Sequence, residues 1–134
     1  NLDAVNFMMD IWHVSQVWDD LIDQNTVDIT ETNHAFLSLL SKIPSNMFYR
    51  RHISDLTPVI TQTILDWHVS NAMEKRSEHE DINRAYMLRA GIYRLFHYCI
   101  FLACGADKAN KLGVDIWDMY GENLETFILE SNNA

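Results

Sequence analysis

The chain has 134 residues and a mass of 15.6 kDa, so we expect residues 1–134 to form a single domain. Its composition, 48% hydrophobic and 22% charged with only 4 Gly and 2 Pro, excludes a disordered or fibrous chain. The net charge of −9 makes nucleic acid a poor partner, because an acidic surface repels phosphate backbones.

Helical periodicity begins close to the N-terminus. Five apolar residues recur there at steps of four and three, Phe7, Ile11, Val14, Trp18 and Leu21. This stripe predicts a helix over residues 3–24. Asp28 or Thr30 can cap a second helix, which Pro44 is expected to end. A short helical or irregular piece is expected over residues 47–53.

Thr57 followed by Pro58 predicts the start of a third long helix, over residues 58–76. Proline suits the first helical position because the N–H that it lacks has no helical partner there. Ser77 with Glu80 three residues later fits a capping box, which predicts that a fourth helix starts at this point.

The fourth predicted helix runs to Cys104, with Gly105 as its C-terminal stop. It is apolar on nearly every side from Ile92 onward, so we expect it to be the most buried element. Within it, Arg94 and His97 lie one turn apart, which indicates a polar pocket or, as we favour, an internal hydrogen-bond network.

Gly113 predicts another break, and a final apolar stripe follows at helical spacing, Trp117, Tyr120, Leu124 and Phe127. The sequence shows no strand-like alternation of useful length. We therefore predict an all-α fold, a compact bundle of five or six helices. We expect a homodimer. So short a chain can bury only a limited fraction of its own apolar surface, and a second copy would cover part of the rest.

Cys99 and Cys104 are five residues apart on one predicted helix and point away from each other, so they do not indicate a disulfide-stapled secreted fold. No apolar run reaches the ~18 residues of a membrane helix, and no signal peptide is visible. We expect a cytoplasmic protein with no membrane partner.

The first candidate site is acidic. Residues 1–41 carry seven acids and no Lys or Arg, and Asp19, Asp20 and Asp23 lie near the end of the first predicted helix. Asp19 and Asp23 project one turn apart on the same side, where they can share Mg²⁺. The alternative is an acidic, solvated helix end, although negative charge there opposes the helix dipole.

The second candidate is Asp66, Ser70 and Glu74, which lie at i, i+4 and i+8 on one face of the third predicted helix. Apolar residues surround them, and a buried carboxylate without a partner is costly. A cation is one possible partner. The structural alternative, which we favour, is an arginine of the next helix, Arg84, Arg89 or Arg94.

Together these motifs carry a resemblance. Asp19-Asp20-x-x-Asp23 resembles the first aspartate-rich motif of class I isoprenoid (terpenoid) synthases, and Asp66-x-x-x-Ser70-x-x-x-Glu74 resembles their second metal motif. The family is all-helical and uses Mg²⁺ to bind and ionise an allylic diphosphate. The resemblance implies a role as metal ligands for these acids and Ser70, and contact with the diphosphate for Lys75, Arg76 or Arg89.

A rival resemblance lies in the C-terminal half. Leu112-Gly113-Val114-Asp115, followed by residues 117–127, is similar to the ending of MazG-type all-helical nucleotide pyrophosphohydrolases, which are Mg²⁺-dependent. Glu78-x-x-Asp81 matches one half of the carboxylate pattern of that family.

Our working hypothesis is an Mg²⁺-dependent helical protein that binds or acts on a phosphorylated small molecule with a diphosphate group, and whether it is an enzyme stays open. The MazG-like activity is one alternative. The other is a non-catalytic helical interaction or accessory protein, whose acids keep it in solution and whose aromatic residues form a dimer.

Overall fold

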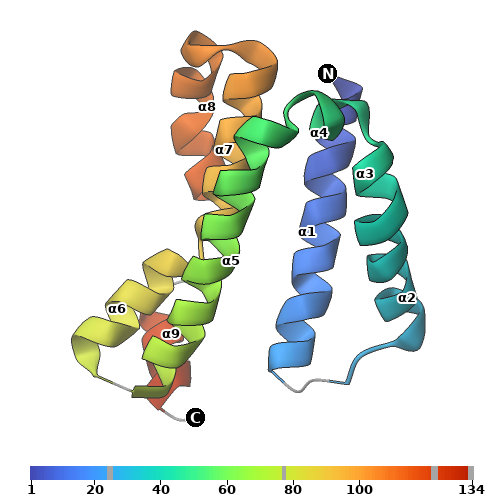
Figure 1. Ribbon diagram of the computed structural model, residues 1–134. Helices are drawn as coiled ribbons and strands as arrows, with labels where there is room; N and C mark the ends of the chain where they lie inside the picture. Colours follow the sequence, from blue (N-terminus) through green and yellow to red (C-terminus); the bar gives the residue numbers. More distant parts are fainter. Residues whose placement is uncertain (24–25, 77, 122–123, 133–134) are drawn as a thin grey trace. The chain divides into compact units, whose positions relative to one another are not determined.

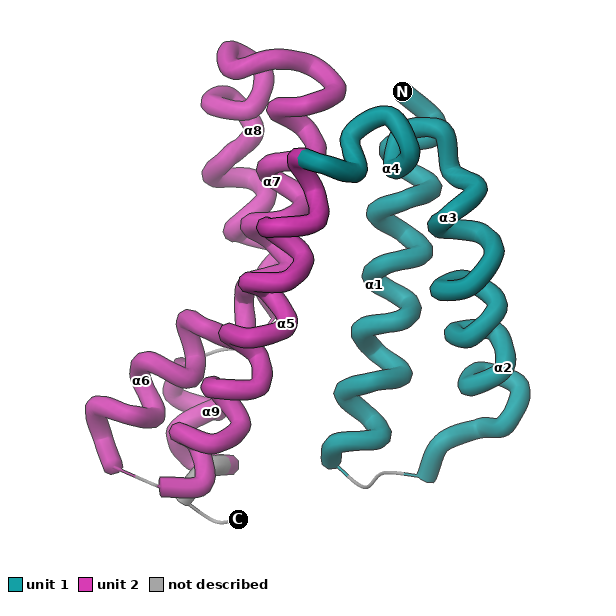
Figure 2. The backbone as a smooth tube through the Cα atoms, viewed as in Figure 1, with its two compact units in different colours: residues 1–54 teal, residues 55–134 magenta. Residues whose placement is uncertain are grey.

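The computed structural model describes residues 1–23, 26–76, 78–121 and 124–132 (Figure 1). These residues are almost entirely helical and form no strand, which confirms the all-α prediction. Seven helices of nine residues or more occur in this part of the chain, against the five or six predicted. The chain divides into two compact units, residues 1–54 and 55–134, and each is described by itself (Figure 2). The single domain stays a prediction.

Unit 1 opens with α1 (Leu2–Ile22), in close agreement with the first predicted helix. Its N-cap is Asn1, whose Oδ1 accepts a hydrogen bond of 3.2 Å from the Ala4 N–H. Phe7 is fully buried, and its ring stacks on Tyr49 with centroids 5.4 Å apart. The predicted stripe does not stay buried to its end, because Leu21 is 53% exposed.

The second predicted helix is composite. α2 (Ile29–Leu37) begins after Asp28, whose Oδ1 accepts from the Thr30 N–H at 2.9 Å. A π-helical turn, η1 (Ser38–Lys42), and the short α3 (Ile43–Ser45) continue it. The helical run therefore ends one residue after Pro44, the predicted stop.

The short piece that follows is helical. α4 (Met47–Arg51) has Asn46 as its N-cap, and Asn46 Oδ1 accepts from the Tyr49 N–H at 2.9 Å. The amide nitrogen of the same side chain, Nδ2, donates to the Asp3 carbonyl at 2.8 Å. One amide side chain thus starts α4 and ties it to the beginning of α1.

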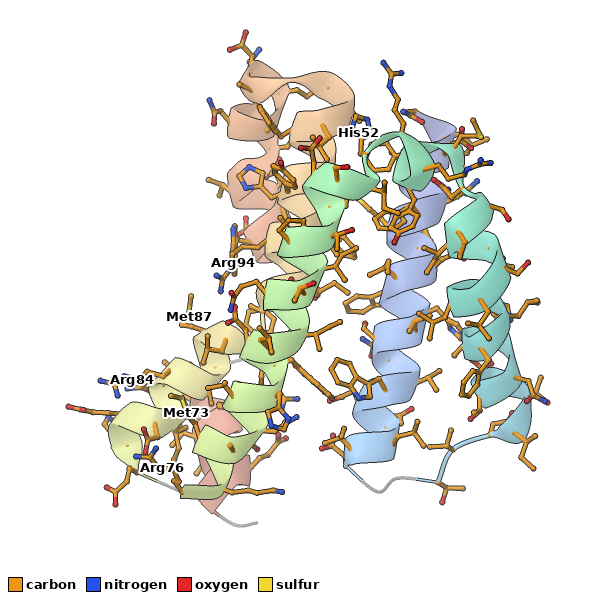
Figure 3. The ribbon with its side chains drawn as sticks, in the orientation of Figure 1. His52, Met73, Arg76, Arg84, Met87 and Arg94 are labelled. Carbon is orange, nitrogen blue, oxygen red and sulfur yellow. The ribbon has the colours of Figure 1, made fainter. Side chains whose placement is uncertain are left out.

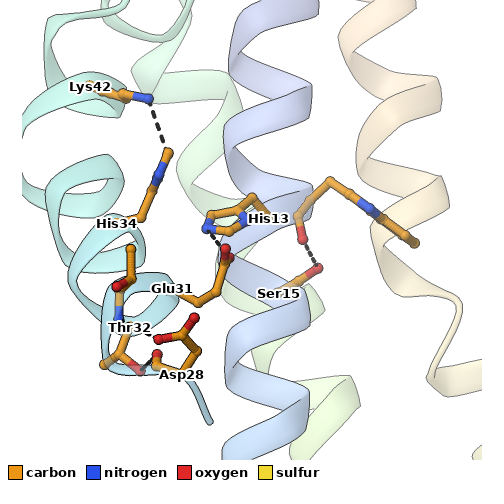
Figure 4. Close-up of polar contacts among 9 residues, drawn as sticks. His13, Ser15, Asp28, Glu31, Thr32, His34 and Lys42 are labelled. Atoms are coloured by element: carbon orange, nitrogen blue, oxygen red, sulfur yellow. Dashed lines mark hydrogen bonds and ion pairs between the residues drawn. The ribbon is translucent and has the colours of Figure 1, made fainter.

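Polar side chains join α1 to α2 and η1 (Figure 4). His13 Nε2 lies 3.4 Å from Glu31 Oε2, and the rings of His13 and His34 are edge to face with centroids 4.6 Å apart. Lys42 Nζ is 3.2 Å from His34 Nε2. These contacts set how α1 and α2 lie against each other within unit 1.

α5 (Ile53–Arg76) begins at the last two residues of unit 1 and continues as the longest helix of unit 2. The predicted start at Pro58 is wrong, because Pro58 lies inside the helix. Thr57 does not cap it: the Thr57 carbonyl accepts from Thr61 Oγ1 at 2.8 Å within the helix. The proline removes one backbone hydrogen bond early in the helix, and the remaining turns tolerate that loss.

The fourth predicted helix is two helices, α6 (His79–Leu88) and α7 (Gly91–Cys104). Gly91 starts α7 where a β-carbon would lie 3.3 Å from Thr63 Cγ2 of α5, so the two helices approach closely at the break. The N-cap of α6 is Glu78. The capping box predicted on Ser77 lies outside the described residues.

α7 buries Tyr93, Leu95 and Cys99, whereas Phe101 is 45% exposed. It is therefore buried on one side rather than all round. Gly105 ends α7 as predicted, with a φ of 90° that favours glycine. Cys99 and Cys104 are free thiols, the first buried and the second exposed.

The predicted break at Gly113 is wrong, because α8 (Ala106–Asp118) continues through it. A β-carbon at Gly113 would lie 3.3 Å from His97 Nε2, so this glycine allows α7 and α8 to pack closely. The final predicted stripe is divided between α8 and α9 (Leu124–Asn132). Phe127 of α9 packs in a core with Ile82 and Ala85 of α6.

Within the described ranges, no helix combines the length and the apolar content that a bilayer crossing requires.

Candidate functional site

The first acidic motif lies at the C-terminal end of α1. Asp23 is the C-cap, and its N–H donates to the Asp19 carbonyl at 3.0 Å, so the two residues are one turn apart as predicted. Asp19 is half-buried, and Asp20 and Asp23 are exposed. The last turn of α1 carries no basic residue, so the motif adds to the negative end of the helix dipole.

The second motif lies on α5, in unit 2. The Asp66 side chain is 16% exposed, and its Oδ1 accepts from Gln62 Nε2 at 2.7 Å. Its Oδ2 lies 3.9 Å from Arg94 Nη1 of α7. That separation is longer than a hydrogen bond, so the ion pair is loose.

Glu74, two turns further along α5, has a closer cation. Arg89 Nη1 donates to Glu74 Oε2 at 3.2 Å, and the two side chains are 13% and 27% exposed. The Arg89 guanidinium also lies over the Phe127 ring, 5.5 Å from its centroid. Arg89 is therefore held between a carboxylate and an aromatic face.

Ser70 lies between the two acids in sequence and is fully buried. Its hydroxyl donates to the Trp67 carbonyl at 2.6 Å. The predicted phosphate contacts Lys75 and Arg76 are exposed at the end of α5, and Arg76 Nε lies 3.2 Å from Asp81 Oδ2. The structural alternative predicted for this motif is thus present, because both of its acids, Asp66 and Glu74, face an arginine.

The structure does not assemble a ready metal cage in the part of the chain that it describes. Across residues 1–23, 26–76, 78–121 and 124–132, no group of three or more His, Cys, Asp or Glu side chains is arranged to hold a metal ion. Any cation bound on the α5 face would therefore need oxygen atoms from its ligand or from water in addition to the two carboxylates. Mg²⁺ is commonly held in this way.

The residues of the rival resemblance are dispersed. Glu78 is exposed at the start of α6, while Asp81 is buried and paired with Arg76. Residues 112–115 lie inside α8. Only one carboxylate of that pair is open to a ligand, so the geometry gives the MazG-like alternative no support.

A groove that the sequence only indicated lies elsewhere in unit 2. Arg94 and His97 line it together with residues of α5 and α8. His97 is also part of a network, because its Nε2 is 2.9 Å from the Ala109 carbonyl. The hydrogen bond of His97 agrees with the network that we favoured, and the groove beside it is mostly apolar rather than the polar pocket of the alternative.

No protein-family model matches the chain, no curated protein is significantly similar to its sequence, and no solved structure is significantly similar to its fold.

Proposed function

We propose that the acidic face of α5, together with Arg89, binds a divalent cation and a small molecule that carries a diphosphate. The observation that carries the proposal is the contact of 3.2 Å between Arg89 Nη1 and Glu74 Oε2, with Asp66 two turns away on the same helix. Carboxylates are Mg²⁺ ligands, and a guanidinium is a strong phosphate donor. A face that offers both groups matches a cation bound with its phosphate anion.

The ion pair can exchange partners when such a ligand binds. A diphosphate oxygen would replace Glu74 as the acceptor for Arg89, and the freed carboxylate would take the cation. Phe127 would keep the guanidinium in place during this exchange, since the cation–π contact does not depend on Glu74. A bound Mg²⁺ would supply charge neutralisation for a leaving diphosphate or activation of a water.

Asp19, Asp20 and Asp23 are included in the proposal as a further cation-binding motif, in unit 1. Their support is the one-turn spacing of Asp19 and Asp23 and the absence of a basic residue in the last turn of α1. Replacing both Asp19 and Asp23 by Asn tests this part separately, because the change leaves the α5 face intact.

Calorimetric titration with MgCl₂, with and without pyrophosphate, tests the α5 site. We expect the chain to bind Mg²⁺ more tightly when pyrophosphate is present. Glu74→Gln should weaken Mg²⁺ binding under both conditions, whereas Arg89→Gln should remove the enhancement by pyrophosphate and leave the binding of Mg²⁺ alone equal or stronger, because it frees the Glu74 carboxylate. The absence of binding heat under both conditions would reject the proposal.

Matched controls come from α6. Arg84 Nη2 and Glu80 Oε2 form an exposed ion pair of 3.7 Å outside the proposed site. Glu80→Gln and Arg84→Gln therefore make the same charge changes and should leave both titrations unchanged. If these variants lower binding as much as Glu74→Gln and Arg89→Gln do, the effect is one of overall charge and the α5 site is wrong.

A non-catalytic interaction protein is the second candidate, in which the ion pairs of α5 are structural. The observation that favours it is the exposure of large apolar side chains in unit 1, among them Leu2, Ile29 and Leu40 at 74%, 78% and 76%. The proposed partner is a second copy of the chain. Sedimentation should then show a dimer that Leu40→Ser weakens, and a chelator should leave the thermal midpoint unchanged.

A further inference from the structure

Unit 2 contains a groove of about 480 Å³ along one face of α7, from Arg94 to Phe101, with the start of α8 and one residue of α5 completing its wall. Its wall is mostly apolar, and Val59, Tyr98, Phe101 and Ala106 contribute to it. This volume is within the range of small-molecule sites. None of Asp66, Glu74 and Arg89 lines the groove, so it is distinct from the site proposed above, and the ion pair of 3.9 Å between Arg94 and Asp66 is the contact between the two.

The lining has one charged side chain, Arg94. Figure 3 shows this side chain extending outward from α7, and it is half exposed. Its ion pair with Asp66 Oδ2, at 3.9 Å, is too long for a hydrogen bond. The guanidinium therefore keeps N–H donors for a further acceptor, since an arginine has five.

The start of α8 adds positive potential at the end of the groove away from Arg94, because α8 begins only after α7 has run ten residues beyond Arg94. Gly105 is the N-cap and provides no side-chain cap hydrogen bond, and Ala106, the first residue of α8, lines the groove. The N–H groups of a first helical turn favour an anion. Asp107, also in this turn, is exposed and does not line the groove.

The apolar wall favours an aromatic group. Tyr98 and Phe101 stack with ring centroids 5.8 Å apart and an interplanar angle of 25°. Phe101 is 45% exposed, so part of an aromatic surface is open to a ligand. Asn110 provides a neutral polar group beside it. An aryl ring can bury itself on this wall while its charged end reaches Arg94.

We propose that this groove binds a small aryl carboxylate. The planar fork of a single guanidinium matches a carboxylate, and a monoanion suits one arginine better than a dianion does in a chain of net charge −9. The proposal goes beyond the function proposed above and does not depend on it, because no metal ion and no diphosphate is involved.

Two probes of the same aryl group and chain length test the proposal, 4-phenylbutyrate and the neutral 4-phenylbutanol. Titration followed by ¹H–¹⁵N NMR should shift the backbone amides of groove residues, among them Arg94, Phe101 and Ala109. The carboxylate should bind roughly tenfold more tightly than the alcohol, the factor that one charge-assisted hydrogen bond provides. Equal affinity for the two probes, shifts confined to residues that do not line the groove, or no shift at millimolar probe would overturn the proposal.

Two variants separate the contribution of the Arg94 charge to binding from that of the apolar lining. Arg94→Gln should reduce the affinity for phenylbutyrate to that for the alcohol, whereas Phe101→Ala should weaken both probes. Arg84→Gln is the matched control and should change neither. Glu74→Gln should leave phenylbutyrate binding intact, so loss of the diphosphate site and loss of this groove give different results.

Discussion

His97 and Gly113 face each other so closely that a β-carbon on Gly113 would lie 3.3 Å from His97 Nε2. The same ring nitrogen is 2.9 Å from the Ala109 carbonyl, which fixes the ring against α8. α7 and α8 are therefore joined at a position where only glycine fits without displacing the histidine. This contact explains why a helix continues through a residue whose type indicates a break.

Gly113→Ala should fail to stabilise the chain, although alanine is better than glycine inside a helix by about 1 kcal/mol. The added methyl group has to push His97 away from Ala109, and we expect a net loss in the free energy of unfolding. In a His97→Ala background the same change should instead stabilise, by up to about 1 kcal/mol. Urea unfolding of the unmodified chain, the two single variants and the double variant measures the coupling energy between positions 97 and 113. If the two changes have additive effects on the free energy of unfolding, the contact is contradicted.

Gly105→Ala should destabilise the chain by about 1 to 3 kcal/mol, because φ is 90° and ψ is 174° at this position, a conformation almost restricted to glycine. A β-carbon added here would meet no atom within 4 Å, so the cost is backbone strain rather than a clash. Gly105→Asn should not restore stability, since asparagine relieves strain only in the left-handed helical region. Gly121→Ala, also without a close neighbour, is the control and should change little.

Asn46→Ala should cost unit 1 about 1 to 2 kcal/mol, because it removes both the α4 cap and the hydrogen bond to the Asp3 carbonyl. Asn46→Ser retains a cap acceptor and loses only the donor to Asp3, so its cost should be about half as large. Chemical unfolding measures both values. Equal losses in the two variants would show that the cap at Asn46 contributes nothing beyond the bond to Asp3.

Cys99 should resist thiol reagents that label Cys104. Burial raises the pKa of the Cys99 thiol from 9.0 to about 12, so little of the reactive thiolate forms at neutral pH. Cys104 is exposed. Labelling of the folded chain should stop at one thiol, and the second should react only in denaturant. Rapid labelling of both without denaturant would contradict the burial of Cys99.

The same thiol should make stability fall at alkaline pH. Below pH 9 the thiol is protonated in both states and adds no pH dependence. Between pH 9 and pH 12 only the unfolded state loses the proton, which lowers the free energy of unfolding by about 1.4 kcal/mol per pH unit. Cys99→Ala should lack this contribution while sharing every other titration. If the free energy of unfolding has the same pH dependence in the unmodified chain and in Cys99→Ala, the contribution of the Cys99 thiol is excluded.

Much of unit 1 could be predicted from the sequence. The stripe that starts at Phe7 defines α1, and Asp28 caps α2 as its side chain predicts, because both signals act within one or two turns of helix. In unit 2, the acidic residues Asp66 and Glu74 could also be identified from the sequence, and their arginine partners are among the three that the sequence suggested. Periodicity, caps and charge are local properties, and local properties are visible in a sequence.

Only the tertiary structure decided several of the points at which helices begin or break, and where they meet. Pro58 and Gly113 look like boundaries in sequence, yet α5 and α8 continue through them, and α6 ends before Gly91 without a strong local signal. The reason is that packing against another helix outweighs intrinsic preference. The close approaches of Gly113 to His97 and of Gly91 to Thr63 exist only between segments that are distant in the chain.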